Sequence, residues 1–299
     1  MFRFRREQKV LDVSDVKIGG QPSELPTVLI GSLFHVGHKI VEDRKMGIFD
    51  RRKAEQLIRV QEEISEKTGV PCMLDIAGEN PVALIIYIEF VSEVTNAPFL
   101  INGPEMSVRT SAARYAAESG LKDRAIYTSI NYTIGDKEIE AIKETWLKAA
   151  IVQSFNPKNP RPEGMMSMLR ELLDSASKAG IEKPLILTSI LDVPSIGFGA
   201  QGISLAKEEW GMPTGTALIG VVGQWSKVEE LGQYAKKMCR AGASALVQAM
   251  GADFIIYGSV AKARDIFPVC AMIDAVVAYN ARNFGISPLT KNHPLYKIF

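Results

Sequence analysis

Cysteine is scarce in this chain, and its few copies are scattered. Cys72, Cys239 and Cys270 lie far apart in the sequence, each among apolar residues. An odd, unclustered set of thiols argues against a disulfide framework and against a C-x-x-C metal site. We therefore expect three reduced, structural cysteines, no metal held by the chain itself, and a cytoplasmic location.

The chain also lacks an excess of charge and any long apolar run. Lys and Arg total 35 against 34 for Asp and Glu, a formal net charge of +1, so no basic surface for nucleic acid or anionic membranes is indicated. No stretch of 18 apolar residues occurs, and the start MFRFRREQKV lacks the apolar core of a secretory signal. We expect neither nucleic acid nor membrane as a partner, but a small molecule or another protein.

Short apolar, β-branched segments alternate with helical patterns along most of the sequence, which is typical of βαβ units. Residues 50–67 show apolar residues at i, i+3 and i+4 spacing. We expect Asp50 to cap this helix and Gly69 to end it. Asn80 with Pro81, and Asp136, are predicted to open later helices.

Eight segments read as strands that are buried on both faces, as in a parallel sheet. They are residues 27–34, 71–77, 98–103, 125–131, 149–155, 184–190, 215–222 and 253–259. Eight βα units with right-handed crossovers close most simply into a barrel. The alternative, an open doubly wound sheet, calls for G-x-G-x-x-G after the first strand, where this chain has GSLFHVGH.

The predicted fold is therefore α/β: a (β/α)8 TIM barrel forming one domain over residues 1–299. A short β-ribbon is predicted to precede it. Its arms are residues 2–10 and 16–19, on either side of a turn at Ser14 and Asp15.

Polar side chains collect where the predicted strands end, which in a TIM barrel is the ligand-binding face. The candidates are Asp75, Asn102, Thr128, Ser129, Asn131, Gln153, Asn156, Thr188, Ser189, Asp192 and Ser259. Asp75 and Asn102 stand out because small residues follow them and leave room for a ligand. For Asn156, Asp192 and Glu79, a helix cap or a turn is an equal alternative.

The candidate set is rich in amides and hydroxyls and poor in carboxylates, which suits a flat heterocycle with a hydrogen-bonding edge. Asp75 or Asp192 can accept two N–H bonds from an amino-pyrimidinone edge. A phosphate site would need a glycine-rich loop with a cation near the last strands, where only Lys262 is found. His35 and His38 form an H-x-x-H pair without a third ligand, so turn or supporting roles are favoured over a metal site.

Several segments, taken in their order along the chain, resemble one known family. They include EQKVLDVSDVKIGGQP, EEISEKTGVPCMLDI, AIYTSIN, KAAIVQSFNPKNP, LDVPSIG and HPLYKIF, and they span nearly the whole chain. The chain resembles the H-subunit family of tetrahydromethanopterin S-methyltransferase, and within it the bacterial methylcorrinoid-protein:tetrahydrofolate methyltransferases of glycine-betaine-type demethylation.

This resemblance implies a methyltransferase of one-carbon metabolism and methylotrophy that binds tetrahydrofolate as a substrate. The methyl group would pass between N5 of the pterin and the cobalt of a cobalamin carried by a separate corrinoid protein. No catalytic acid or base is singled out by the sequence.

The resemblance also implies pterin contacts from Asn102, the segment Thr128 to Asn131, Thr188 and the end of the seventh strand. Related enzymes usually carry Asp, Asn and Asp at the positions of Asn102, Thr128 and Thr188, and an Asn where this chain has LIGVVGQW. These departures favour tetrahydrofolate. The alternatives are an archaeal-type H subunit that uses tetrahydromethanopterin, a non-catalytic pterin-binding scaffold, and a pterin-synthesis or hydrolase enzyme, which would need an anion or metal site.

Several apolar residues near the C-terminus are not accounted for by the predicted strands of the barrel. Val276, Val277 and Tyr279 lie in a helix predicted over residues 261–282, and the tail 285–299 ends in LYKIF. We expect a homodimer that uses this face, with packing against the barrel core as the alternative.

Overall fold

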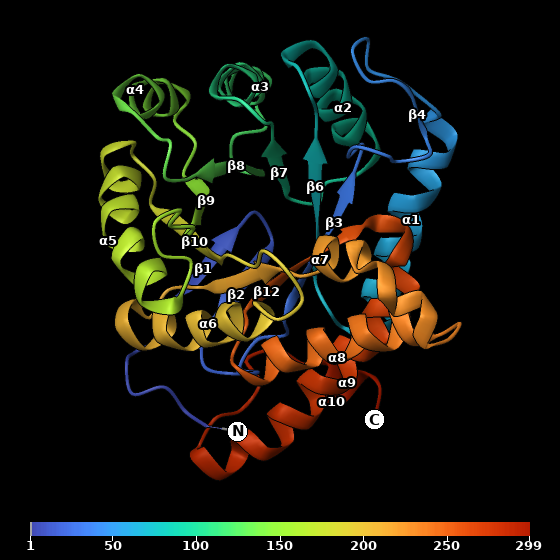
Figure 1. Cartoon of the computed structure of the whole chain (residues 1–299), viewed down its shortest axis with the longest axis vertical. Helices are drawn as coiled ribbons and strands as arrows, with labels where there is room; N and C mark the ends of the chain where they lie inside the picture. Colours follow the sequence, from blue (N-terminus) through green and yellow to red (C-terminus); the bar gives the residue numbers. More distant parts are fainter. Residues whose placement is uncertain (1) are drawn as a thin grey trace.

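The computed structural model describes residues 2–299, except for the side chain of Ile219. In this part of the chain, eight parallel strands close into a ring (Figure 1). They are β3 (Val28–Leu33), β6 (Cys72–Ala77), β7 (Phe99–Asn102), β8 (Ala125–Ile130), β9 (Ala149–Gln153), β10 (Lys183–Thr188), β11 (Thr214–Ala217) and β12 (Phe254–Ser259). Neighbours in sequence pair with each other, and β12 pairs with β3 to close the ring. The predicted TIM barrel is confirmed.

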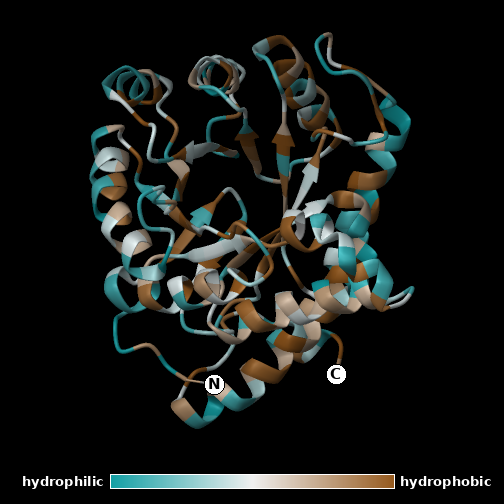
Figure 2. Cartoon of the chain, in the orientation of Figure 1, coloured by the Kyte–Doolittle hydropathy of each residue, from teal (hydrophilic) through white to brown (hydrophobic). Residues whose placement is uncertain are grey.

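Helices cover the outside of the ring and turn polar faces to water (Figure 2). They are α1 (Arg51–Thr68), α2 (Pro81–Val94), α3 (Met106–Glu118), α4 (Asp136–Thr145), α5 (Pro162–Lys178), α6 (Ile196–Trp210), α8 (Ala235–Ala249) and α9 (Ala263–Ala281). Asp50 accepts a hydrogen bond from the Lys53 N–H and caps α1, which ends at Gly69 with φ 74°. Asn80 caps α2 in the same way, so the predicted helix boundaries are confirmed.

Alternate residues of each strand point into the barrel, since side chains of a strand face opposite sides of a sheet. The interior is filled by apolar residues from every part of the ring: Val28, Ile30, Met73, Leu100, Ile126, Ile151, Leu185 and Phe254. An antiparallel hairpin of β1 (Val10–Val13) and β2 (Val16–Gly19) adds Val13 and Ile18 to this cluster. Inward-facing polar residues are therefore confined to the carboxyl ends of the strands.

The first arm of the N-terminal ribbon was predicted wrongly. The strand begins at Val10, not at Phe2, because the preceding segment bonds elsewhere. The N–H of Phe4 donates to Gln21 Oε1, and that of Lys9 donates to the carbonyl of Gly211 after α6. This segment therefore connects the hairpin to the barrel wall.

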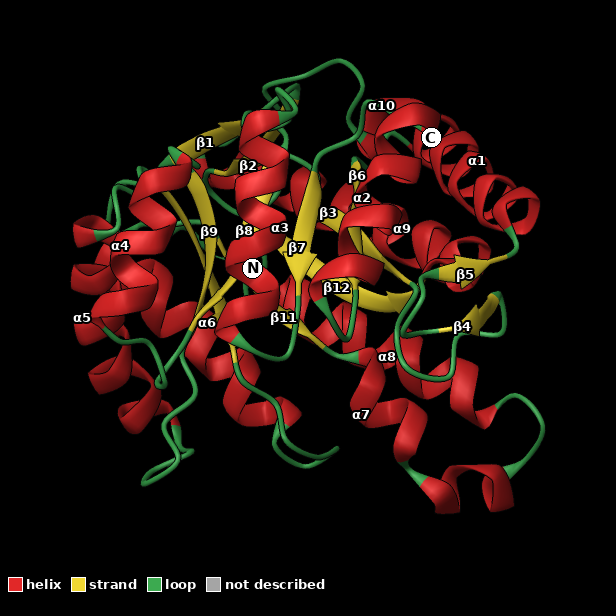
Figure 3. Ribbon diagram, turned by 90° about the horizontal axis from the view of Figure 1, so that it is seen from above, coloured by secondary structure: helices red, strands yellow, loops and turns green. Residues whose placement is uncertain are grey.

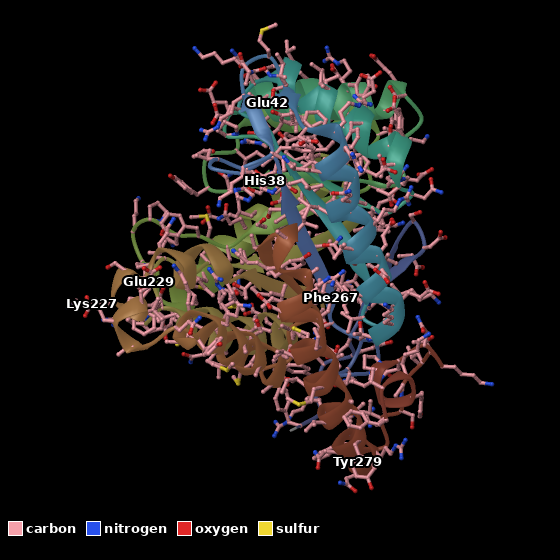
Figure 4. All side chains as sticks on the ribbon, turned by 90° about the vertical axis from the view of Figure 1, so that its right-hand side faces the viewer. His38, Glu42, Lys227, Glu229, Phe267 and Tyr279 are labelled. Atoms are coloured by element: carbon pink, nitrogen blue, oxygen red, sulfur yellow. The ribbon has the colours of Figure 1, made fainter. Side chains whose placement is uncertain are left out.

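The seventh strand is also shorter than predicted. β11 stops at Ala217, and residues 219–224 form a short helix, α7 (Ile219–Gln224). Leu218 and Val222 join the apolar cluster outside the ring. The 3-10 helix η1 (Ser226–Leu231) follows. Figure 3 shows α7 outside the ring, and Figure 4 shows Lys227 and Glu229 at the outer edge of the molecule.

The predicted self-association face is only partly exposed. On α9, Val276 and Tyr279 are 46% and 68% exposed, whereas Val277 is 4% exposed and packs inward. Figure 4 places Tyr279 at the far end of this helix from Phe267. Val277 therefore does not belong to the predicted self-association face, and the homodimer stays a prediction.

Among the described residues, no helix has both the length and the apolar character needed to cross a bilayer.

A buried histidine makes the stability of the fold depend on pH. His293 is fully buried before the short helix α10 (Pro294–Lys297), where its Nδ1 accepts from the Leu295 N–H. Burial lowers its pKa from 6.5 to about 4. Between these values the unfolded chain binds a proton that the folded chain does not, so stability is full above pH 6.5 and falls as the pH drops towards 4.

His293→Asn is expected to reduce this acid sensitivity, because asparagine can still cap α10 but does not titrate. Between pH 7 and pH 4.5 the variant should lose about 2 kcal/mol less free energy of unfolding than the wild type. Urea unfolding at a series of pH values measures this difference. Parallel pH profiles of the two proteins would contradict it.

Candidate active site at the barrel mouth

Three adjacent strands bring a chain of polar side chains to the mouth of the barrel. Asp75 on β6 is 4% exposed. Its Oδ2 accepts from Ser32 Oγ on β3 at 2.6 Å, and its Oδ1 accepts from Asn102 Nδ2 on β7 at 2.9 Å. Burial raises the pKa of Asp75, while these two hydrogen bonds and the nearby charge of His35 act in the opposite direction.

Asp75 keeps hydrogen-bonding capacity for a ligand. An ionised carboxylate offers about four acceptor sites, two on each oxygen. Ser32 and Asn102 occupy one on each oxygen, which leaves two for donors arriving from the mouth. Ser32 was not predicted, although the alternation Val28, Ile30, Ser32 along the first strand could have shown that it faces inward.

A second polar group lies beside the first, at the ends of β8 and β9, which follow β7 in the ring. Ser129 Oγ lies 3.3 Å from Gln153 Oε1, and Asn131 Nδ2 donates to the Ser129 carbonyl and hydroxyl. The amide oxygen of Asn131 accepts from the Thr133 N–H, so this side chain also stabilises the turn after β8. Thr128 is buried beside them.

Three predicted site residues lie outside these groups. Thr188 packs against Gly202 of α6, on the outer face of the sheet, and its hydroxyl donates to the carbonyl of Gly215. Asn156 uses its side chain within its own loop, donating to the Gly164 carbonyl and accepting from Lys158 and Asn159. Asp192 is exposed and accepts from the Ser195 N–H at 2.9 Å before α6. We therefore leave all three out of the proposed contacts.

Ser189 and Ser259 complete the rim. The Ser189 hydroxyl is buried and finds no hydrogen-bond partner in the described part of the chain. It lines a cleft of about 250 Å³ together with Phe155, Leu191 and Phe198. Ser259 lies at the end of β12, in register with Ser32. An apolar cleft with a free hydroxyl beside the polar groups suits a flat ring.

The loop after β3 is held rigidly over this mouth. Phe34, with φ 61°, stacks on Tyr87 of α2 at 4.1 Å between ring centroids. Its N–H donates to Nδ1 of His38 at 3.1 Å, and burial, followed by the charge of His35, lowers the pKa of His38 to about 4. The strand β4 (Val41–Asp43), which pairs with β5 (Ile48–Phe49), follows this loop, and Figure 4 shows His38 below Glu42 of β4.

The two histidines pair with each other and not with further metal-binding groups. Among the described residues, no group of three or more His, Cys, Asp or Glu side chains is arranged to hold a metal ion. The imidazole of His35 stacks on that of His38, with 4.7 Å between the centroids.

Two of the clefts that are larger than the one beside Ser189 lie at the opposite end of the barrel. Clefts of about 530 and 830 Å³ share Asp15, Glu62, Pro71 and Cys72 near the first hairpin. We place the site at the other end because the carboxyl ends of TIM-barrel strands form the active face, and because the inward-facing polar side chains are there.

Solved structures with a similar fold include dihydropteroate synthases. Dihydropteroate synthase from Yersinia pestis, in a complex with a sulfonamide drug, aligns with a TM-score of 0.64 over 90% of this chain and 98% of its own, at 12% identity. A truncated 3-deoxy-D-arabino-heptulosonate 7-phosphate synthase from Thermotoga maritima aligns with a TM-score of 0.53 at 14% identity, over 94% and 95%. At these identities the likeness concerns the fold alone.

Sequence relatives are much closer. The H subunit of tetrahydromethanopterin S-methyltransferase from Methanothermobacter thermautotrophicus is 40% identical over the full length of both chains. The H subunit of the putative methyltransferase mtx from Methanosarcina barkeri is 41% identical over 99% of each. The family profile described as tetrahydromethanopterin S-methyltransferase MtrH subunit matches residues 6–289. The chain therefore belongs to the MtrH family of tetrahydromethanopterin S-methyltransferase subunits, and it is a methyltransferase of that type.

Proposed function

We propose that this protein moves a methyl group between N5 of a tetrahydropterin and a corrinoid carried by a separate protein. The observation that carries the proposal is the buried Ser32–Asp75–Asn102 chain, which presents two unused carboxylate acceptor sites to the mouth. A reduced pterin has an amino-pyrimidinone edge with two adjacent N–H donors, which matches a bidentate carboxylate.

The remaining polar groups complete the proposed binding mode. Gln153, Ser129 and Asn131 would contact the pterin from the strands that follow β7 in the ring, with Thr128, Ser189 and Ser259 around it. In this binding mode the methyl group on N5 would have to remain within reach of the corrinoid partner. Holding the reacting atoms in line makes the transfer effectively unimolecular, which can lower the barrier by several kcal/mol.

The names of the relatives support tetrahydromethanopterin as the substrate ahead of tetrahydrofolate. The relative that is 40% identical over its whole length is named for tetrahydromethanopterin and comes from an archaeon. This ranking reverses the expectation drawn from the departures at Asn102, Thr128 and Thr188. Thr188 lies on the outer face of the sheet, so its departure does not bear on the choice of pterin. The bacterial, glycine-betaine-type assignment has no support from these relatives.

Calorimetric titration tests the proposal and ranks the substrates. We expect tetrahydromethanopterin and its 5-methyl form to bind with micromolar affinity, and tetrahydrofolate to bind about tenfold more weakly, a difference of about 1.4 kcal/mol. Mixing the 5-methyl form with reduced free cobalamin should then yield methylcobalamin, followed by absorbance. Tighter binding of tetrahydrofolate would restore the folate assignment. Binding without any methyl transfer, also with a corrinoid protein supplied, would favour a non-catalytic scaffold.

A further inference from the structure

We propose that the imidazole of His35 exchanges a proton with N5 of the pterin, through its Nε2 atom, during methyl transfer. This inference rests on the function proposed above and adds a proton-carrying residue to it. His35 lies two residues after β3, at the mouth of the barrel.

The backbone around His35 is fixed without using its Nε2 atom. Phe34 is anchored by its stacking on Tyr87 and by edge contacts with Phe49 and Phe90. The N–H of His38 donates to the carbonyl of His35 at 2.9 Å, and the Phe34 N–H donates to Nδ1 of His38. The His35 side chain is therefore held in place on a rigid turn, as proton transfer to a bound substrate requires.

The hydrogen bonds of His35 determine which ring nitrogen is free. Nδ1 lies 2.9 Å from the carbonyl oxygen of Val36. A carbonyl oxygen only accepts, so Nδ1 bears the hydrogen, and in the neutral ring Nε2 presents its lone pair. Nε2 is buried and has no partner in the described part of the chain. A buried acceptor without a partner is unfavourable, and a hydrogen bond from a substrate would remove this cost.

The neighbouring ring, His38, is not suited to carry this proton. His38 is buried, its Nδ1 already accepts from the backbone, and its lowered pKa of about 4 keeps it neutral near pH 7. Asp75 lies close enough for the charge of His35 to lower the pKa of that carboxyl against the larger, opposing effect of burial. Of the two rings, His35 is therefore the one to which we assign the proton.

Proton exchange between Nε2 of His35 and N5 of the pterin balances the charge on N5 in both directions of methyl transfer. When methyl leaves the pterin, Nε2 first gives its proton to N5, which becomes cationic. The electron pair of the reduced corrinoid forms the carbon–cobalt bond, the carbon–N5 bond breaks, and its pair stays on N5 as a neutral N–H amine. In the opposite direction N5 attacks the methyl carbon, and the proton released from N5 goes to the lone pair of Nε2.

His35→Gln separates proton transfer from binding. A glutamine amide can form a hydrogen bond near the position of Nε2 but cannot carry the proton. We expect the dissociation constant for the 5-methyl pterin to stay within about threefold, and the methyl transfer rate to reduced free cobalamin to fall about 100-fold. A 5,5-dimethyl tetrahydropterin, whose N5 is permanently cationic, needs no proton and should react equally fast with variant and wild type.

Lys39→Gln is the control, because the Lys39 side chain is exposed in the same loop. This variant should match the wild type in pterin binding, methyl transfer rate and melting temperature. The proposal is overturned if His35→Gln keeps more than about a third of the rate. It is also overturned if the variant slows both substrates alike, or if it loses affinity in proportion to rate. Failure of the wild type to bind any reduced pterin would instead reject the proposed function, and this inference with it.

Discussion

Lys207→Met is expected to lower the free energy of unfolding by about 3–5 kcal/mol, because it leaves a buried carboxylate without its counter-charge. Lys207 Nζ lies 2.5 Å from Asp253 Oδ1 and 3.0 Å from the Gly20 carbonyl. The two side chains are 0% and 6% exposed. Methionine would fill the apolar space but leave Asp253 with the Thr214 N–H alone. Urea unfolding followed by circular dichroism measures the loss.

The chain offers a matched control for this experiment. Lys148 and Glu182 are also 2.5 Å apart, but their side chains are 41% and 63% exposed. Lys148→Met should therefore cost less than about 1 kcal/mol. Adding Asp253→Asn to Lys207→Met should recover part of the loss, since the neutral amide is cheaper to bury. Equal effects of the two single lysine substitutions would contradict the importance of burial.

This ion pair connects distant parts of the chain at the end of the barrel opposite the site. Lys207 belongs to α6, Gly20 follows the N-terminal hairpin, and Asp253 precedes β12. Neither charge was predicted to be buried, because the residues around Lys207 read as the polar face of an amphipathic helix. Only the packing of the N-terminal segment, with Phe4 against Lys207, covers that face.

The barrel itself was predictable because its strands are buried on both sides. Near-continuous apolar runs alternating with helical patterns leave few other folds open. The pattern misleads at LIGVV, where the apolar run continues past the strand into α7. Leu218 and Val222 pack against helices there, and periodicity alone does not separate a buried strand from a short buried helix.

The candidate site was predictable by position along the strands but less well by the direction of the side chains. Asp75 and Asn102 both point inward and are joined by a hydrogen bond. Thr188 is equally near a strand end but faces α6, because Leu187 beside it fills the interior. Alternation along a strand separates the two faces, and the register of neighbouring strands is needed to tell which face is inside.

The role proposed for His35 could not be reached from the sequence. An H-x-x-H pair in a loop is compatible with a turn, a metal site or a catalytic group. The distinction depends on the Val36 carbonyl, which accepts from Nδ1, and on the buried position of Nε2. Both follow from a backbone turn at Phe34 with a positive φ, stabilised by aromatic residues that lie up to 56 positions further along the chain, at Phe90.

Asp75→Asn is expected to weaken tetrahydropterin binding about 100-fold, a loss of about 2.8 kcal/mol. The amide keeps the size of the side chain, and it can still bond to Ser32 and to a reoriented Asn102. It loses the negative charge, and it presents an N–H in place of one acceptor. Charge-assisted hydrogen bonds contribute about 1.5–3 kcal/mol each, so one lost bond and one weakened bond account for the expected change. Calorimetric titration with tetrahydromethanopterin measures it.

Asp192→Asn is the matched control, since Asp192 is the other carboxylate predicted for this pterin edge. Its side chain is exposed and accepts from the Ser195 N–H in the turn before α6, a role that asparagine performs equally well. The affinity of this variant should therefore stay within about twofold of the wild type. A large loss from Asp192→Asn with little change from Asp75→Asn would move the pterin to the cleft beside Ser189. The buried polar chain at Asp75 would then be structural, and the methyl group would have to be presented from the side of the mouth formed by β9 and β10.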